Sequence, residues 1–248
     1  MTGAQCFSRF ESQLPIPEIG EDGQQRLLNA SVLVIGAGGL GSTVLYCLAG
    51  AGVGRLGIAD GDVVSLSNLN RQFLYTPADV GQKKAFAAAR QLSAFYPCGT
   101  IEPYPINVTS DNAAALAASY DLVILAVDSL AARLAVNEAC CLLGKNLIDG
   151  GVDGYFGRAL VVEPGKTACL QCIYGDSGVI TPPHPLSFAP VVSLIAALEA
   201  QLALTLLMGQ HNPIPDRILY YDGHDLSLQK ISVRKNPDCT VCGASTAG

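Results

Sequence analysis

Apolar and polar positions follow two periods that succeed each other along the first 150 residues. Short runs of β-prone apolar residues predict buried strands, and longer stretches with apolar residues on one helical face follow them. We expect strands at 32–35, 55–59, 100–104, 121–127 and 146–148, and helices at 40–51, 83–95, after Ser110 and at 130–143. Such alternation predicts a parallel, doubly wound α/β sheet.

The pattern changes after Gly150, where strands no longer alternate with helices. Residues 155–163 and 217–234 have the composition of antiparallel strands. A proline-rich loop at 181–185 and a long apolar helix at 190–208 lie between them. We therefore expect a Rossmann-like doubly wound sheet that is continued by C-terminal antiparallel strands.

The same pattern divides this single expected domain into three segments. Residues 1–29 are a polar, proline-containing lead-in. We expect residues 30–150 to form the Rossmann-like half, and residues 151–248 to form an antiparallel half on which a protein partner could dock.

Composition and charge exclude several classes of protein. The net charge of −6 is spread along the chain without a basic block, which argues against nucleic acid and against an anionic membrane surface. Two apolar tracts, 40–59 and 186–208, are interrupted by glycine, proline and polar residues, so we expect buried helices and no membrane span. The first residues lack the pattern of a secretory signal, and we expect a cytoplasmic protein.

A glycine-rich turn follows the strand at 32–35 and opens the next helix. Its glycines are Gly36, Gly38, Gly39 and Gly41. Without side chains, the backbone N–H groups of such a turn can approach phosphate oxygens at the positive end of a helix. Asp60, after the second strand, could accept hydrogen bonds from ribose hydroxyls in a dehydrogenase or an ATP site alike. These residues predict a nucleotide and leave its identity open.

The following loop favours a triphosphate. Asn68, Arg71 and Gln72 come just after the expected ribose site, and Lys84 lies at the start of a helix. Arginine and lysine neutralise the outer phosphates, which a dinucleotide does not have. Asp128 follows the strand 121–127, where open α/β sheets bind ligands, and a carboxylate that faces a triphosphate is a typical Mg²⁺ ligand. The sequence therefore predicts ATP with Mg²⁺, bound by the Rossmann-like half at residues 30–150.

Two C-x-x-C pairs form a second group of candidate ligands, Cys169 with Cys172 and Cys239 with Cys242. Four thiolates match the tetrahedral ligand set of a structural zinc ion, without an open position for catalysis. Two disulfides or a chance spacing are the alternatives, and reducing conditions disfavour the former. We expect the other five cysteines to be small buried apolar residues.

With these motifs in place, the chain closely resembles the MoeB/ThiF/HesA family, the bacterial relatives of ubiquitin-activating enzymes. The resemblance rests on the segments 36–41, 60–62, 67–72 and 80–84, on Asp128 with Arg133, and on the four paired cysteines. It implies a homodimer that adenylates the C-terminal glycine carboxylate of a ubiquitin-like (β-grasp) sulfur carrier ending in Gly-Gly, for molybdopterin or thiamine-type biosynthesis.

The resemblance also implies roles for individual residues. Asp60 and Asp62 would belong to the nucleotide site with Gln72, Asp60 holding the ribose. Asn68, Arg71 and Lys84 would hold the phosphates, and Asp128 the Mg²⁺ ion. Arg71, Lys84 and Asp128 would thus carry the catalysis.

Three positions depart from the family pattern. The resemblance makes residues 1–29 a dimer arm, and Ser12 stands where members carry an arginine that enters the neighbouring subunit's active site. Arg9 is the nearby candidate to replace it. Pro182 stands where many relatives carry a cysteine, so a separate sulfur donor would have to receive the adenylate. Ser129 replaces the usual asparagine.

Three alternative functions remain open on the sequence. The same chemistry could act on a peptide or on a protein of a conjugation system. A weakly catalytic scaffold that binds a β-grasp partner would be compatible with the loss of the arginine at position 12. A NAD-dependent dehydrogenase is disfavoured by the triphosphate loop and the cysteine pairs.

Overall fold

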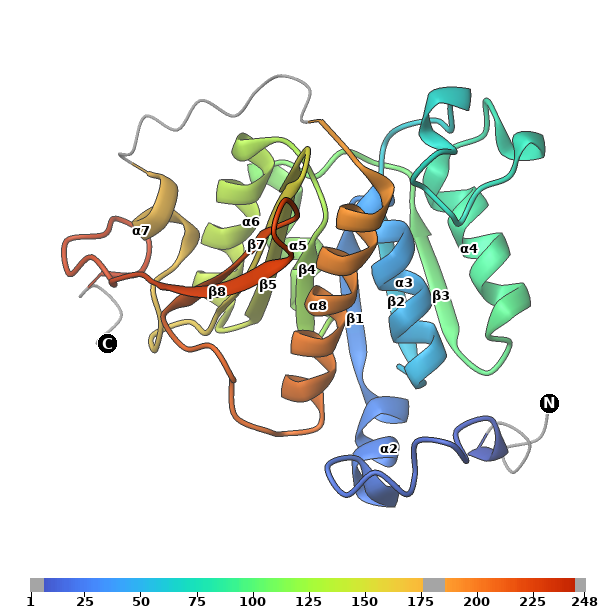
Figure 1. The fold of residues 1–248 in the computed structure, drawn as a ribbon, viewed down its shortest axis with the longest axis horizontal. Coiled ribbons are helices and arrows are strands. Elements are labelled where there is room, and N and C mark those ends of the chain that lie inside the picture. Colours follow the sequence, from blue (N-terminus) through green and yellow to red (C-terminus); the bar gives the residue numbers. More distant parts are fainter. Residues whose placement is uncertain (1–6, 176–185, 244–248) are drawn as a thin grey trace.

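The fold is built on one eight-stranded sheet in the order β3-β2-β1-β4-β5-β6-β7-β8 (Figure 1). The structure is a computed structural model that describes residues 7–175 and 186–243. Strands β1 to β5 run parallel, and β6, β7 and β8 continue the sheet antiparallel. The strands are β1 (Ser31–Ile35), β2 (Arg55–Ala59), β3 (Thr100–Tyr104), β4 (Leu122–Leu125), β5 (Asn146–Asp153), β6 (Phe156–Val162), β7 (Arg217–Asp222) and β8 (Ser227–Ser232). This order confirms the predicted doubly wound sheet with its antiparallel extension.

Helices cover both faces of the parallel part of the sheet (Figure 1). Helices α3, α4 and α8 contribute to the core on one face, and α5, α6 and α7 to the core on the other. The helices are α2 (Gly20–Asn29), α3 (Gly39–Ala51), α4 (Lys84–Phe95), α5 (Ser110–Ala118), α6 (Leu130–Leu143), α7 (Leu170–Tyr174) and α8 (Ala189–Leu207). Two short 3-10 helices, η1 (Leu66–Asn68) and η2 (Pro77–Asp79), shape the loop between β2 and α4.

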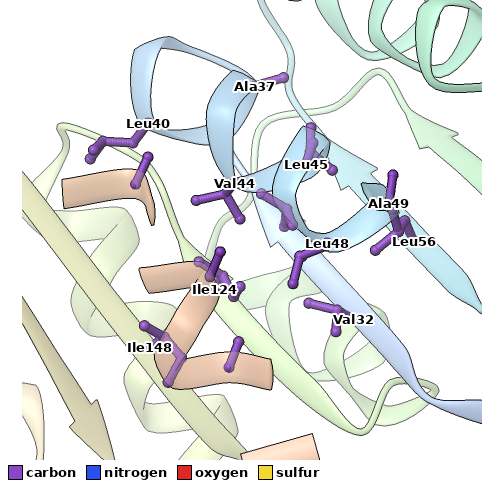
Figure 2. Packing of buried hydrophobic residues seen from close by; sticks show 14 of the residues in the cluster. Val32, Ala37, Leu40, Val44, Leu45, Leu48, Ala49, Leu56, Ile124 and Ile148 are labelled. Carbon is purple, nitrogen blue, oxygen red and sulfur yellow. The ribbon is translucent and has the colours of Figure 1, made fainter. Parts of the chain in front are cut away.

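Strand β1 shows how the apolar sequence fills both cores. Val32 and Val34 face α3 and α8, and Leu33 and Ile35 face the opposite core, because successive side chains of a strand alternate between faces. Figure 2 shows Val32 among side chains of α3, such as Leu45 and Leu48. A strand buried on both faces explains why β1 has four consecutive apolar residues.

Helix α8 is a helix of 19 residues that packs against α3 and against β5 and β6. It is long and apolar enough to cross a membrane by length and composition, and 50% of its most apolar window is buried inside the structure. This burial confirms the expectation of a core helix for its part of the tract 186–208.

Strand β5 is longer than the sequence indicates. The predicted strand ends at residue 148, whereas β5 continues to Asp153 and forms a hairpin with β6 through Gly154, which has φ of 59°. Gly150 and Gly151 interrupt the apolar pattern without interrupting the ladder. A Cβ at Gly150 would lie 2.2 Å from Cδ of the buried Glu199 on α8, so any larger residue there would force that side chain to move.

The strand order places the candidate site. From β1 the chain builds the sheet outward to β2 and β3 on one side, and it then returns to the other side of β1 with β4 and β5. Loops at the carboxyl ends of β1 and β4 therefore leave in opposite directions and open a crevice, as at other switch points of α/β sheets. The division of the domain at residues 29 and 150 stays a prediction.

Candidate active site

A cavity of about 700 Å³ lies at the carboxyl ends of the parallel strands. Small-molecule sites have volumes of roughly 300–1,000 Å³, so the cavity has room for a nucleotide. The predicted residues that line it are Gly36, Gly38, Gly39, Asp60, Asp62, Asn68, Arg71, Gln72, Lys84 and Asp128. They come from the ends of β1, β2 and β4, the η1 loop and the start of α4. The fold thus places residues that are distant in sequence around one cavity.

The glycine turn depends on two contacts that exclude a side chain. Gly36 has φ of 94°, and a Cβ there would lie 2.4 Å from the Ala126 carbonyl oxygen. A Cβ on Gly41 would lie 1.9 Å from the Gly36 carbonyl oxygen. Gly41 does not line the cavity, so its position supports a role in shaping the turn, and direct contact of Gly41 with a nucleotide stays a prediction.

Replacing Gly41 with alanine should destabilise the protein and weaken ATP binding, because the turn must move away from the new methyl group. Overpacking of this kind costs about 1–3 kcal/mol. Gly50 on the same helix is a matched control, since a Cβ there meets nothing within 4 Å. Gly50→Ala should stabilise the helix by about 0.5–1 kcal/mol. Chemical denaturation of the two variants checks this, and equal effects would contradict the packing argument.

Asp60 fixes the glycine turn to β2. Its Oδ2 accepts a hydrogen bond from the backbone N–H of Ala37 at 2.7 Å, and its Oδ1 accepts one from Asp62 at 2.8 Å. The Tyr75 hydroxyl donates to the Ala37 carbonyl at 2.7 Å, and burial followed by the charge of Asp60 raises the pKa of Tyr75. Asp60 therefore already has a structural role, and its contact with a ribose stays a prediction.

The residues predicted to bind phosphates have defined partners within the protein. Lys84 is buried at the start of α4, and its Nζ lies 3.0 Å from Asp62 Oδ2. Arg71 donates through Nη1 to the Ser67 carbonyl and to Asn70 Oδ1, both at 3.0 Å. Asn68 accepts at Oδ1 from the Ser65 N–H at 3.2 Å, so its amide N–H groups are the part that can serve a phosphate.

The four paired cysteines lie together at the junction of α7 and the C-terminal segment. All four Sγ atoms lie within 4.8 Å of one another. Three of the Sγ–Sγ distances are 3.9 Å (Cys169–Cys172), 3.7 Å (Cys169–Cys239) and 3.4 Å (Cys172–Cys242). Tetrahedral zinc with Zn–S bonds of about 2.3 Å needs sulfurs about 3.8 Å apart. The cluster could hold zinc without rearrangement of the backbone.

Three of the four sulfur atoms in this cluster accept hydrogen bonds. The backbone N–H of Asn236 donates to Cys172 Sγ at 3.4 Å, and that of Cys242 donates to Cys239 Sγ at 3.5 Å. The Cys141 thiol donates to Cys169, which lowers the pKa of Cys169 well below its ordinary value. Thiolates are the form that binds zinc, so the contacts on Cys169 favour it as a ligand. Burial raises the pKa of Cys172 and of Cys242 in the metal-free cluster.

The other five cysteines agree only in part with the expectation that they are small buried apolar residues. Cys140 is buried, and Cys47 and Cys141 are partly buried free thiols. Cys98 is partly buried and disulfide-bonded, so the expectation of a small buried apolar residue there was wrong. The spacing of cysteines does not reveal such pairing. Cys6 lies outside the described residues.

A known protein family matches nearly the whole chain, including the residues of the cavity and the first cysteine pair. The ThiF family model matches residues 10–241, from the N-terminal arm to the second cysteine pair. The chain belongs to the ThiF family.

Individual relatives agree with this assignment. The sulfur carrier protein adenylyltransferase of Thermus thermophilus is 39% identical over 251 residues, covering 96% of this chain and 91% of the relative. The adenylyltransferase and sulfurtransferase MOCS3 of Aedes aegypti is 36% identical, and the match covers 95% of this chain but 55% of that longer protein. A crystal structure of E. coli MccB with a succinimide has a TM-score of 0.85 at 23% identity, covering 98% of this chain and 75% of MccB, which shows a shared fold.

Part of the cavity of this ThiF-family protein was missed by the sequence reasoning. The additional lining residues include Ile106, Asn107, Val108, Gly151, Val152, Asp153, Arg158, Ser187 and Val192. Those that follow β3 and end β5 could have been found from the rule that ligands bind at the carboxyl edge. Arg158 carries no such signal, because it lies inside the apolar pattern of β6.

A buried ion pair lies beside the cavity, and one of its members, Arg133, lines the cavity. Arg133 on α6 donates to Asp149 on β5 and to the Gly150 carbonyl at 2.8 Å. It also donates to the Val127 carbonyl. Burial, with the charge of Arg158, lowers the pKa of Arg133 to about 10, so it stays protonated at neutral pH. Arg133 thus connects α6 with the ends of β4 and β5, next to Asp128.

Glu199 on α8 lies fully buried beside this pair. Neither of its carboxyl oxygens has a hydrogen-bond partner among the described residues. Burial raises the pKa of Glu199 well above its ordinary value, and Arg133 and Arg158 act in the opposite direction. We therefore expect a protonated Glu199 in the folded protein.

Replacing Glu199 with glutamine should stabilise the protein increasingly as the pH rises. Above about pH 4.3 the unfolded wild type loses a proton that the folded state keeps, so its free energy of unfolding falls with pH. Glutamine does not titrate, so the difference between variant and wild type should grow between about pH 5 and pH 8. Denaturant unfolding measures it, with exposed Glu138→Gln as the control. A difference that does not change with pH would contradict the assignment.

Proposed function

We propose that this chain is an ATP-dependent adenylyltransferase that activates the C-terminal glycine carboxylate of a ubiquitin-like sulfur carrier. The observation that carries the proposal is the cavity at the switch point, with Arg71, Lys84 and Asp128 around the glycine turn. The family assignment and the 39% identity to a sulfur carrier protein adenylyltransferase support it.

The chemistry needs positioning and charge neutralisation more than proton transfer. A terminal carboxylate has a pKa of about 3.5, so it is already a nucleophile at neutral pH and needs no general base. The glycine turn and the start of α3 offer backbone N–H groups to phosphates, and Arg71 and Lys84 offset charge on the departing pyrophosphate. Held in line with the α-phosphate, the carboxylate gives an acyl-adenylate and pyrophosphate.

Two metal ions complete the proposal. Asp128 would hold Mg²⁺, which supplies charge neutralisation at the phosphates, and its exposed position on the cavity wall fits that ligand. Cys169, Cys172, Cys239 and Cys242 would hold a zinc ion with every coordination position taken by sulfur. That zinc stabilises the fold and takes no part in the reaction.

The antiparallel half offers a surface for the carrier. Exposed aromatic side chains gather at β6 and its neighbours: Tyr155 stacks on Phe188 with ring centroids 5.1 Å apart, and Phe156 stacks on the partly buried Tyr220 at 6.0 Å. This surface adjoins the β5–β6 wall of the cavity, so a carrier docked there could extend its Gly-Gly end into the site. We also propose that the protein is a homodimer in the cytoplasm. We further propose that a separate sulfur donor receives the adenylate. This proposal rests on Pro182, which lies outside the described residues.

ATP–pyrophosphate exchange tests the proposal. We expect exchange only when a β-grasp protein with a free Gly-Gly end is present, and none with the same protein lacking the last two glycines. Exchange with short peptides alone would favour a peptide substrate. Binding of β-grasp proteins without any exchange would favour a scaffold and contradict the proposed activity.

A further inference from the structure

The cavity has a second charged wall that the phosphate residues do not explain. It is formed by the β5–β6 hairpin and the start of α8, with Gly151, Asp153, Arg158 and Val192 among its residues. Arg158 lies on β6, directly opposite Gly151 in the antiparallel ladder. This wall belongs to the half of the chain that carries the exposed aromatic surface, so an incoming protein tail would pass it before reaching the phosphates.

The guanidinium of Arg158 is held in a fixed orientation. Its Nε donates to the hydroxyl of Tyr174 at 2.7 Å, and its Cζ lies 5.2 Å from the centre of that ring. On its other side it packs on the backbone of Gly151, where a Cβ would lie 2.7 Å from Nη1. Tyr174 ends α7, the helix whose N-cap is Cys169, so the cysteine cluster anchors the residue that orients Arg158.

Among the described residues, the terminal nitrogens of Arg158 make no short hydrogen bond, and Nη2 takes part in one long ion pair. Asp149 Oδ2 lies 3.9 Å from Nη2. This buried oxygen has no hydrogen-bond partner among the described residues, because Arg133 bonds the other oxygen, Oδ1. The Arg158 side chain is 30% exposed, whereas that of Arg133 is 5% exposed. Among the described cavity cations, Lys84 is paired with Asp62 and Arg71 is bonded to its own loop. Within the described chain, Arg158 is therefore a partly exposed guanidinium of this cavity whose only carboxylate partner is the distant Asp149 Oδ2, so an incoming anion would compete with that one long ion pair.

We propose that Arg158 binds the terminal carboxylate of the incoming chain and that Tyr174 is its positioning residue. The inference rests on the proposed function. A guanidinium binds a carboxylate through two parallel hydrogen bonds, which fixes its orientation. It also offsets the repulsion between the carboxylate and the triphosphate. One carboxylate oxygen forms a bond to the α-phosphorus, the bond from that phosphorus to pyrophosphate breaks, and no proton is transferred.

The carboxylate is a better match than a phosphate because of where Arg158 lies. The residues that suit a triphosphate, the glycine turn with Arg71 and Lys84, come from β1, the η1 loop and α4. Arg158 comes from β6, on the other side of β4 and β5 in the sheet order. A substrate that enters from the antiparallel half meets Arg158 with its end group.

The experiment compares a β-grasp protein with a Gly-Gly carboxylate and the same protein with that carboxylate converted to an amide. Calorimetry gives the dissociation constant of each form with the full-length enzyme. Wild type should prefer the carboxylate by about 10- to 100-fold, the range of a charged hydrogen-bonded pair. Arg158→Gln should bring this preference close to one and raise KM for the carrier, with KM for ATP unchanged. Arg158→Lys should recover part of the preference.

Tyr174→Phe tests the positioning role, because it removes the hydroxyl and keeps the ring. It should lower the carboxylate preference by a smaller factor than Arg158→Gln. Arg217→Gln and Tyr46→Phe are matched controls; Arg217 is exposed at the start of β7, and Tyr46 packs on Phe95 away from the cavity. Both should retain the wild-type preference and exchange rate.

The outcomes separate this inference from the proposed function. Wild-type exchange together with an undiminished preference in Arg158→Gln overturns the inference alone. An Arg158→Gln variant that raises KM for ATP as much as KM for the carrier also overturns it, in favour of a phosphate contact. Lack of exchange in wild type with any Gly-Gly protein contradicts the proposed function and the inference together. Thermal melting shows whether each variant is folded.

Discussion

Replacing Asp128 with asparagine should lower the rate of ATP–pyrophosphate exchange by about 10³-fold while the protein stays folded. Asp128 is exposed, follows β4 at the carboxyl edge and lines the cavity. Loss of its charge would weaken Mg²⁺ binding, and the metal contributes several kcal/mol of charge stabilisation in such transition states. Exchange measured over a range of Mg²⁺ concentrations should show a raised requirement for the metal.

Glu138→Gln is the matched control for this substitution, since it removes one carboxylate from the exposed face of α6, the helix that follows Asp128. It should leave exchange unchanged. An Asp128→Asn enzyme with the wild-type rate and the wild-type Mg²⁺ requirement would show that this carboxylate does not hold the metal.

Replacing Cys239 with serine should remove the bound zinc and lower the melting temperature by roughly 5–15 °C, as loss of several kcal/mol does in a protein of this size. Cys239 is buried, and its Sγ lies 3.7 Å from that of Cys169. Its loss would release the C-terminal segment from α7. Elemental analysis of the purified protein and thermal melting measure the two effects.

Cys47→Ser provides the comparison, because Cys47 is a free thiol on α3 that is not one of the four clustered cysteines. It should keep one zinc ion per chain. Wild-type protein that is purified without zinc and does not bind it when the metal is added would contradict the metal assignment.

The fold could be predicted where one physical signal dominates. Strands buried on both faces, such as β1, are continuous apolar runs, and the glycine turn after β1 is fixed by contacts that allow no side chain. The paired spacing of Cys169 with Cys172 predicted a cluster that the structure assembles with the second pair. In these places local sequence and tertiary contacts require the same residues.

The cavity wall at β5 and β6 could not be predicted, because its signals depend on contacts distant in sequence. In the sequence, Gly150 and Gly151 suggest the end of a strand. In the structure the strand continues, with Glu199 packed on Gly150 and Arg158 packed on Gly151. Arg158 interrupts an apolar strand and has no motif, and only the fold places Tyr174 beside it. Glu199 lies in the apolar sequence of α8, and its burial next to Arg133 is a property of the packed molecule.

The central claim is that this cavity joins the end of a protein chain to the α-phosphate of ATP. Mass spectrometry of a Gly-Gly-terminated β-grasp protein after incubation with the enzyme, ATP and Mg²⁺ measures this directly. We expect the mass of the β-grasp protein to increase by one adenylyl group, and Arg71→Ala or Lys84→Ala enzyme to give little of that product. A β-grasp protein that binds the enzyme but keeps its mass while ATP remains intact or yields ADP would contradict the account.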